Sequence, residues 1–96
     1  MSLEQVLSHV DSCCDTYVAQ LREFVRIPSI SAGADGDAAA AIGRAADFLV
    51  ADFQRLELQA EKIQVTPDTN PLVLARPSTL SPQRPTVLIY GHYDVQ

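Results

Sequence analysis

Apolar residues recur at intervals of three and four along the first part of the chain. Ser2 followed by Gln5 has the form of a capping box, which predicts a helix that begins at Leu3. Because Pro28 disfavours helical geometry at the residue before it, the helix is expected to end near Ile27. The apolar stripe covers about six helical turns and comprises Leu3, Val6, Leu7, Val10, Cys14, Tyr17, Val18, Leu21, Phe24 and Val25.

A second stripe with helical spacing follows a loop of small residues at 29–36, in which Ser29 and Ser31 are expected to hydrogen-bond to local backbone. Asp37 can cap this helix, because an acidic side chain accepts from free backbone N–H groups and suits the helix dipole. The chain reads Arg-Leu-Glu-Leu at 55–58, so no Gly marks where the helix ends. Its buried face is predicted to comprise Ile42, Ala45, Ala46, Leu49, Phe53 and Leu56.

After the second helix the pattern becomes that of strands. Within residues 58–65 the alternation of apolar and polar positions shifts by one residue between Ala60 and Ile63. This shift indicates either a β-bulge or a helix-to-strand change within the segment. A turn at 67–71 precedes a short strand at 72–75, and residues 86–90 have the composition of a strand buried on both faces. Two helices followed by three strands predict an α/β fold in which two amino-terminal helices pack on part of a sheet.

Length and composition narrow the class of protein. Ninety-six residues make at most one small domain. A net charge of −5 argues against nucleic acid as a partner, and the scattered basic residues form no membrane-binding face. The chain lacks the apolar runs of a secretory signal or a membrane span. Cys13 and Cys14 are adjacent and unsuited to a disulfide with each other, so we expect a cytoplasmic protein.

The candidate chemistry lies directly after the last predicted strand, where Gly91 is followed by His92 and Asp94. Ligand sites of open α/β sheets form at the carboxyl ends of strands. Residues two apart on an extended segment project to the same side, and a metal-ligating imidazole usually has its second nitrogen held by a carboxylate. His92 is therefore a candidate metal ligand, and Asp94 either orients its ring or binds a metal itself. The alternative is a turn histidine beside an aspartate that caps nearby amides.

Two further residues offer metal-ligating chemistry. His9 and Cys13 are four residues apart and would share one face of the first helix. A site that combines them with His92 and Asp94 needs this helix to dock beside the end of the last strand, whereas a cysteine beside an apolar stripe is more often simply packed. A catalytic zinc normally has three protein ligands. With His92 as the one convincing ligand, the chain is not expected to complete such a site by itself.

Two stretches resemble a known family. Residues 85–96, Pro-Thr-Val-Leu-Ile-Tyr-Gly-His-Tyr-Asp-Val-Gln, look like the first metal-binding motif of the M20 zinc metallopeptidases, in the branch of carnosine dipeptidase-like and cytosolic non-specific dipeptidase-like enzymes. Residues 21–31, Leu-Arg-Glu-Phe-Val-Arg-Ile-Pro-Ser-Ile-Ser, resemble that family's first helix and its Ile-Pro-Ser exit. The likeness spans nearly the whole chain. One departure is Glu57, where many relatives have a Gly that ends the second helix.

The resemblance implies that residues 1–96 are the amino-terminal portion of a mixed-sheet α/β catalytic domain that binds two zinc ions (Zn²⁺). The residue that matches His92 would bind one zinc, and the one that matches Asp94 would hold that histidine as part of the catalytic site. Such enzymes hydrolyse short peptides through metal-activated water, and a full-length relative is expected to be a homodimer. The other ligands and the general base come later in the family, so this chain alone is expected to be inactive. The alternatives are a non-enzymatic short α/β protein that binds a partner, or a truncated inactive gene product.

Overall fold

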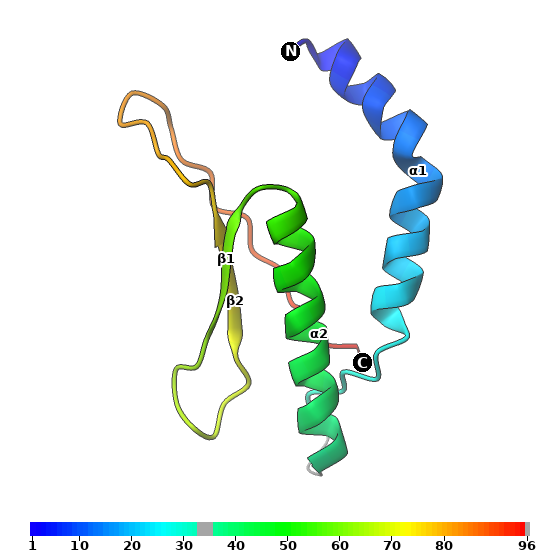
Figure 1. Cartoon of the computed structure of the whole chain (residues 1–96), viewed down its shortest axis with the longest axis vertical. Coiled ribbons are helices and arrows are strands. Elements are labelled where there is room, and N and C mark those ends of the chain that lie inside the picture. The colour runs from blue at the N-terminus through cyan, green and yellow to red at the C-terminus, as the bar shows by residue number, and fades with distance from the viewer. Residues whose placement is uncertain (33–35, 96) are drawn as a thin grey trace.

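The computed structural model describes residues 1–32 and 36–95 (Figure 1). Within these residues the regular elements follow one another in the order α1 (Leu3–Val25), α2 (Gly36–Arg55), β1 (Gln59–Ile63) and β2 (Leu72–Arg76). The two strands form an antiparallel hairpin that packs against α2, while α1 stands on the other side of α2 (Figure 1). The predicted α/β class with two amino-terminal helices is confirmed. Neither helix of the described part of the chain combines the length and apolar character needed to cross a membrane.

Helix α1 begins and ends as the sequence predicts, but its apolar stripe is not covered. The Gln5 backbone N–H donates to Ser2 Oγ at 3.2 Å, and the Ser2 N–H donates to Gln5 Oε1 at 2.8 Å, which completes the capping box. No residue between Leu3 and Val25 is buried. The helix meets α2 through Phe24 and Phe48, whose ring centroids lie 5.3 Å apart. Only α2, therefore, covers the sheet.

The buried core lies on one face of α2 and consists of Ala41, Ile42, Ala45 and Ala46. Three of these were predicted, and Leu49 and Phe53, which were also predicted to be buried, are half-buried. Leu56 is 66% exposed, so its predicted burial is wrong. The reason is that the helix ends at Arg55 and Leu56 belongs to the turn beyond it.

The start of α2 also differs from the prediction. The helix begins at Gly36, so Asp37 lies in the first turn and not at the cap. There its charge still suits the helix dipole, as predicted. The preceding part of the predicted loop, residues 33–35, lies outside the described residues.

The carboxyl end of α2 is closed by a left-handed residue that is not glycine. Glu57 has a φ of 61°. Its N–H donates to the Gln54 carbonyl at 3.0 Å, and the Leu58 N–H donates to the Phe53 carbonyl at 3.1 Å. This pair of bonds is the Schellman arrangement, which usually places Gly at the left-handed position. The helix end that the sequence left undefined is therefore set by backbone bonds around Glu57.

The hairpin pairs without interruption from Gln59 opposite Arg76 to Ile63 opposite Leu72. A bulge between these strands is thereby excluded. The helix-to-strand change ends at Leu58, before the strand, and both Ala60 and Ile63 lie within β1 and are half-buried. Lys62 Nζ lies 2.6 Å from Asp47 Oδ1 of α2 and ties the hairpin to the helix.

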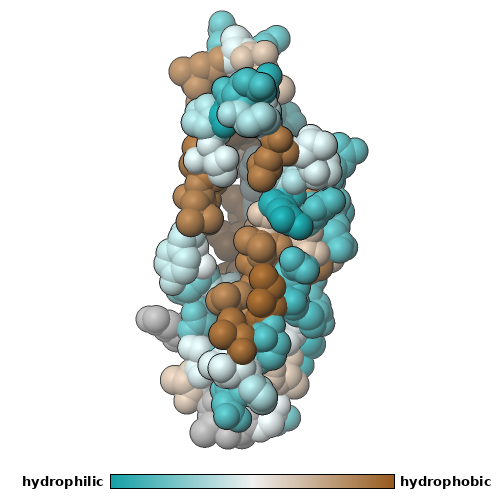
Figure 2. All heavy atoms as spheres, turned by 90° about the vertical axis from the view of Figure 1, so that its left-hand side faces the viewer, coloured by the Kyte–Doolittle hydropathy of each residue, from teal (hydrophilic) through white to brown (hydrophobic). Residues whose placement is uncertain are grey.

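The predicted third strand does not form in the described residues. Residues 85–95 contain no regular strand, and the side chains from Val87 to Tyr90 are 79% to 90% exposed. A strand buried on both faces needs hydrogen-bonded neighbours and a covering layer on each side. The described residues supply one hairpin, so the sheet consists of the antiparallel pair. Figure 2 shows the apolar side chains that reach the surface on the hairpin side of the molecule.

Candidate functional site

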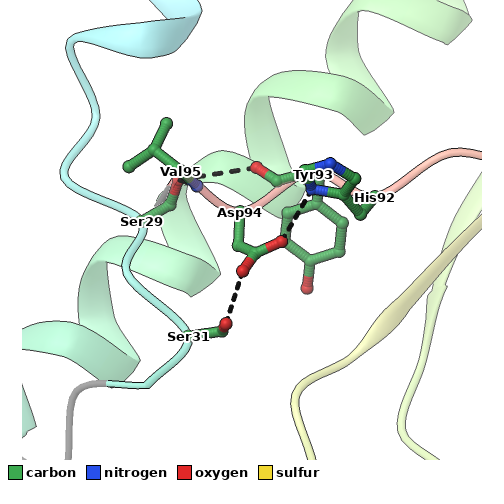
Figure 3. A network of polar contacts seen from close by, with 6 residues as sticks. All are labelled: Ser29, Ser31, His92, Tyr93, Asp94 and Val95. Atoms are coloured by element: carbon green, nitrogen blue, oxygen red, sulfur yellow. Dashed lines mark hydrogen bonds and ion pairs between the residues drawn. The ribbon is translucent and has the colours of Figure 1, made fainter.

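The candidate motif at 92–95 is held against the segment that leaves α1 (Figure 3). The Val95 N–H donates to the Ser29 carbonyl at 2.9 Å and lies 3.3 Å from Ser29 Oγ. Ser29 Oγ in turn donates to the Tyr93 carbonyl at 3.5 Å. Ser29 is 1% exposed. The expectation of a local bond is wrong for this side chain, because its partners lie at the other end of the chain.

The shape of the segment after α1 follows from Pro28, which ends the helix. The Ser29 N–H donates to the Ile27 carbonyl at 2.7 Å, and the Ile30 N–H donates to the Pro28 carbonyl at 2.9 Å. Such bonds between residues two apart define tight γ-turns. The resulting path brings the hydroxyls of Ser29 and Ser31 to the side on which the motif lies (Figure 3).

His92 and Asp94 form the pair that the sequence predicts. His92 Nδ1 lies 2.9 Å from Asp94 Oδ1. Because an ionised carboxylate can only accept, Nδ1 carries the proton of this bond. Nε2 is then the nitrogen whose lone pair remains for a metal. The His92 side chain is 68% exposed and that of Asp94 is 21% exposed. The ring therefore lies at the surface, whereas the carboxylate that holds it is more buried.

The second oxygen of Asp94 is also occupied. Ser31 Oγ donates to Asp94 Oδ2, across 63 positions of sequence. The hydrogen bond from Ser31, and after it the one from His92, hold the pKa of the Asp94 carboxyl below its usual value. Asp94 is therefore an ionised acceptor with a donor on each oxygen. The expectation that Ser31 bonds to local backbone is therefore wrong, because the partner of its hydroxyl is a carboxylate 63 positions away.

The Tyr93 side chain fastens the motif to a second part of the chain. Its hydroxyl donates to the Pro71 carbonyl at 2.6 Å, just before β2. Burial raises the pKa of the Tyr93 phenol and the charge on Asp94 raises it further, while Lys62 acts in the opposite direction. The motif is thus fastened on one side to the exit of α1 and on the other to the hairpin.

The alternative site that adds His9 and Cys13 to the motif is not formed. These two residues do share a helix face, with Cys13 Sγ 3.7 Å from His9 Nε2. However, Cys13 lies 12 residues before the end of α1 at Val25, or about 18 Å along the helix axis at 1.5 Å per residue. The motif contacts Ser29 and Ser31, which lie beyond that end of the helix. Among the described residues, no group of three or more His, Cys, Asp or Glu side chains is placed to hold a metal.

These contacts allow a test of how well the residues fit zinc. His92 suits one ligand position, because its ring is exposed and a carboxylate fixes its other nitrogen. A catalytic zinc needs two more protein ligands, which the described residues do not supply. The described residues therefore fit one ligand position of a zinc site.

Comparison with known proteins gives a consistent set of relatives. The chain is 34% identical over 104 aligned positions to the Cys-Gly metallodipeptidase of Schizosaccharomyces pombe, covering 100% of this chain and 21% of that protein. It is 30% identical over 105 positions to that of Saccharomyces cerevisiae, covering 99% of this chain and 21% of the relative. The chain is 29% identical over 107 positions to the Cys-Gly metallodipeptidase of Candida albicans, covering 100% of this chain and 21% of that protein. No protein-family model and no solved structure matches the chain.

The chain thus spans about a fifth of the length of the curated relatives it matches. The match takes in both stretches that resemble the M20 family, the Ile-Pro-Ser exit of α1 and the His-Tyr-Asp motif, since it covers the whole chain. Over its whole length the chain is homologous to the amino-terminal 21% of the Cys-Gly metallodipeptidases, of the M20 dipeptidase type.

Proposed function

We propose that residues 1–96 form the amino-terminal part of the catalytic domain of a zinc-dependent dipeptidase that hydrolyses short peptides such as Cys-Gly. The observation that carries the proposal is the geometry at His92. Its Nδ1 is bound to Asp94 at 2.9 Å, its ring is exposed, and Nε2 is left for a metal. The homology to Cys-Gly metallodipeptidases supports the substrate class. A cytoplasmic location and a homodimeric assembly belong to the same proposal.

In this function each residue of the motif has a separate task. His92 would provide one imidazole ligand, and zinc suits imidazole well. Asp94 would hold the ring in place and keep its proton on Nδ1. When bound, zinc polarises a substrate carbonyl and lowers the pKa of a coordinated water. The remaining ligands and the general base would come from residues outside the 96 positions, so the chain alone is expected to be inactive.

A second candidate function is partner binding without catalysis. The observation in its favour is the apolar segment from Val87 to Tyr90, which is 79% to 90% exposed. Extended apolar backbone with free hydrogen-bonding groups can add to the edge of another sheet. In this case His92 and Asp94 would serve only to shape the turn after the segment.

A chimera separates the two functions. The chain replaces the matching amino-terminal segment of the Schizosaccharomyces pombe relative, and hydrolysis of Cys-Gly is measured with zinc and after chelation. We expect zinc-dependent hydrolysis, with a loss of at least about 100-fold for His92→Ala. The matched control His9→Ala, on the exposed helix α1, should keep the activity. A folded chimera in which His92→Ala matches the control in zinc content and rate would disprove the proposal.

A further inference from the structure

We propose that Ser31 is a positioning residue for His92, acting through Asp94. By donating to Asp94 Oδ2, Ser31 orients the carboxylate so that Oδ1 receives the Nδ1–H of His92, and Nε2 is the nitrogen presented to a metal. The inference rests on the proposed function in so far as it assigns a metal to Nε2. The arrangement of the three side chains stands on the geometry alone (Figure 3).

The first step of the argument is the number of donors on Asp94. The terminal torsion of an aspartate is broad, so a carboxylate with a partner on one oxygen can turn about the bond that carries it. A second donor on the other oxygen fixes the plane of the group. Ser31 supplies that donor, and His92 supplies the first. The direction of the acceptor lone pair that meets the imidazole is therefore set by Ser31.

The second step concerns what holds Ser31 in register. Ser29 is bound to the Tyr93 carbonyl and to the Val95 N–H, on either side of Asp94. Ser29 is almost fully buried, and its hydrogen bonds place the segment after α1 alongside the motif. Ser31, two residues further on, then faces Asp94. Ser29 thus joins the two backbone segments, whereas Ser31 hydrogen-bonds to the carboxylate that holds the imidazole.

The third step is the consequence for the imidazole. A neutral histidine carries its proton on one of two nitrogens, and the partner of each nitrogen decides which form predominates. The fixed carboxylate favours the proton on Nδ1. Without the Ser31 hydroxyl, the Asp94 carboxylate can turn, and its hydrogen bond to the Nδ1–H of His92 weakens. The form with the proton on Nε2 then becomes populated. That form cannot bind a metal through Nε2.

The test reads the proton position directly in the full 96-residue chain. Long-range ¹H–¹⁵N spectra at pH about 8, where an unperturbed imidazole is neutral, distinguish the two tautomers. The chain contains two histidines, so His9 on α1 is an internal reference. We expect His92 to be protonated on Nδ1 in the parent chain, mixed in Ser31→Ala, and restored in Ser31→Thr, which keeps a hydroxyl. Ser12→Ala, which removes a hydroxyl bound to the His9 carbonyl on α1, should leave His92 unchanged.

Two results would overturn the inference. One is a parent chain in which His92 carries its proton on Nε2, which requires no variant to observe. The other is a folded Ser31→Ala chain whose His92 spectrum equals that of Ser12→Ala. In the chimera, Ser31→Ala should in addition weaken zinc binding by about 10-fold or more. Failure of the tautomer test rejects the role of Ser31, whereas equal zinc content and activity in the His92→Ala chimera rejects the proposed function instead.

Discussion

The backbone N–H of Val95 donates to the carbonyl of Ser29 at 2.9 Å, across 66 positions of sequence. This bond joins the exit of the first helix to the far side of the candidate metal motif. The same serine is 1% exposed and its hydroxyl reaches the Tyr93 carbonyl. The position of His92 and Asp94 therefore depends on a residue near the start of the chain.

Replacing Ser29 by Ala should destabilise the fold. The change removes a buried hydroxyl and leaves the Tyr93 carbonyl without this donor, which costs about 1–2 kcal/mol. The measurement is the free energy of unfolding in urea, with Ser12→Ala as a control because its hydroxyl bond lies on the exposed helix α1. Equal stability of the two variants would show that the Ser29 hydroxyl contributes nothing.

Replacing Glu57 by Gly should stabilise the chain. Glu57 has a φ of 61° at the end of α2, and a residue with a Cβ in this region costs roughly 1 kcal/mol more than Gly. A higher midpoint of thermal unfolding is expected, by a few degrees. The control Glu57→Ala also has a Cβ and should show no such gain. An equal increase for both variants would mean that the gain comes from removing the charge.

The chain should self-associate through the segment from Val87 to Tyr90. These side chains are 79% to 90% exposed, and unpaired extended apolar segments favour pairing between chains. Light scattering after size-exclusion chromatography should show species larger than a monomer at high concentration. Ile89→Lys should shift the chain towards monomer, whereas Val65→Lys, which also replaces an exposed apolar residue, should not. A parent chain that stays monodisperse and unfolds in one sharp transition contradicts this prediction.

Stability should fall at acid pH in a way that depends on Asp94. Its pKa in the folded chain is lowered, chiefly by the Ser31 hydrogen bond and then by His92. A group of this kind stabilises the fold above its unfolded-state pKa, near 3.8, and loses that contribution as the pH falls through the lower folded-state value. The unfolding free energy measured from pH about 6 to about 2 should decline less steeply for Asp94→Asn than for the parent.

The variant Ser31→Ala provides a second test of this pH prediction. In Ser31→Ala, the pKa of Asp94 followed by carboxyl ¹³C chemical shifts should rise, because the leading cause of its depression is gone. An unchanged carboxyl pKa in this variant is the result that speaks against the Ser31–Asp94 bond.

Much of the fold follows from local sequence. The capping box at Ser2 and Gln5 and the break at Pro28 define α1, because caps and proline act within a few residues. The hairpin strands follow from short apolar runs on either side of a turn. The His92–Asp94 pair is also local, since residues two apart on extended backbone face the same side. The metal-binding hypothesis for the motif was accessible from sequence for this reason.

The prediction of a third strand was wrong because it depended on neighbours, and a disfavoured alternative site was decided in the same way. The composition of residues 86–90 is that of a buried strand, but burial requires layers that the described residues do not provide. His9 and Cys13 carry suitable chemistry, yet the length of α1 separates them from the motif.

The helices, the hairpin and the His92–Asp94 pair can be identified from local sequence, because each depends on residues close together in the chain. The contacts that support this pair are set by the tertiary structure alone. Ser29 and Ser31 meet Val95 and Asp94 across more than sixty positions. Contacts at this separation arise from how α1, its exit and the final segment come together in space, and no local pattern of residue types encodes them.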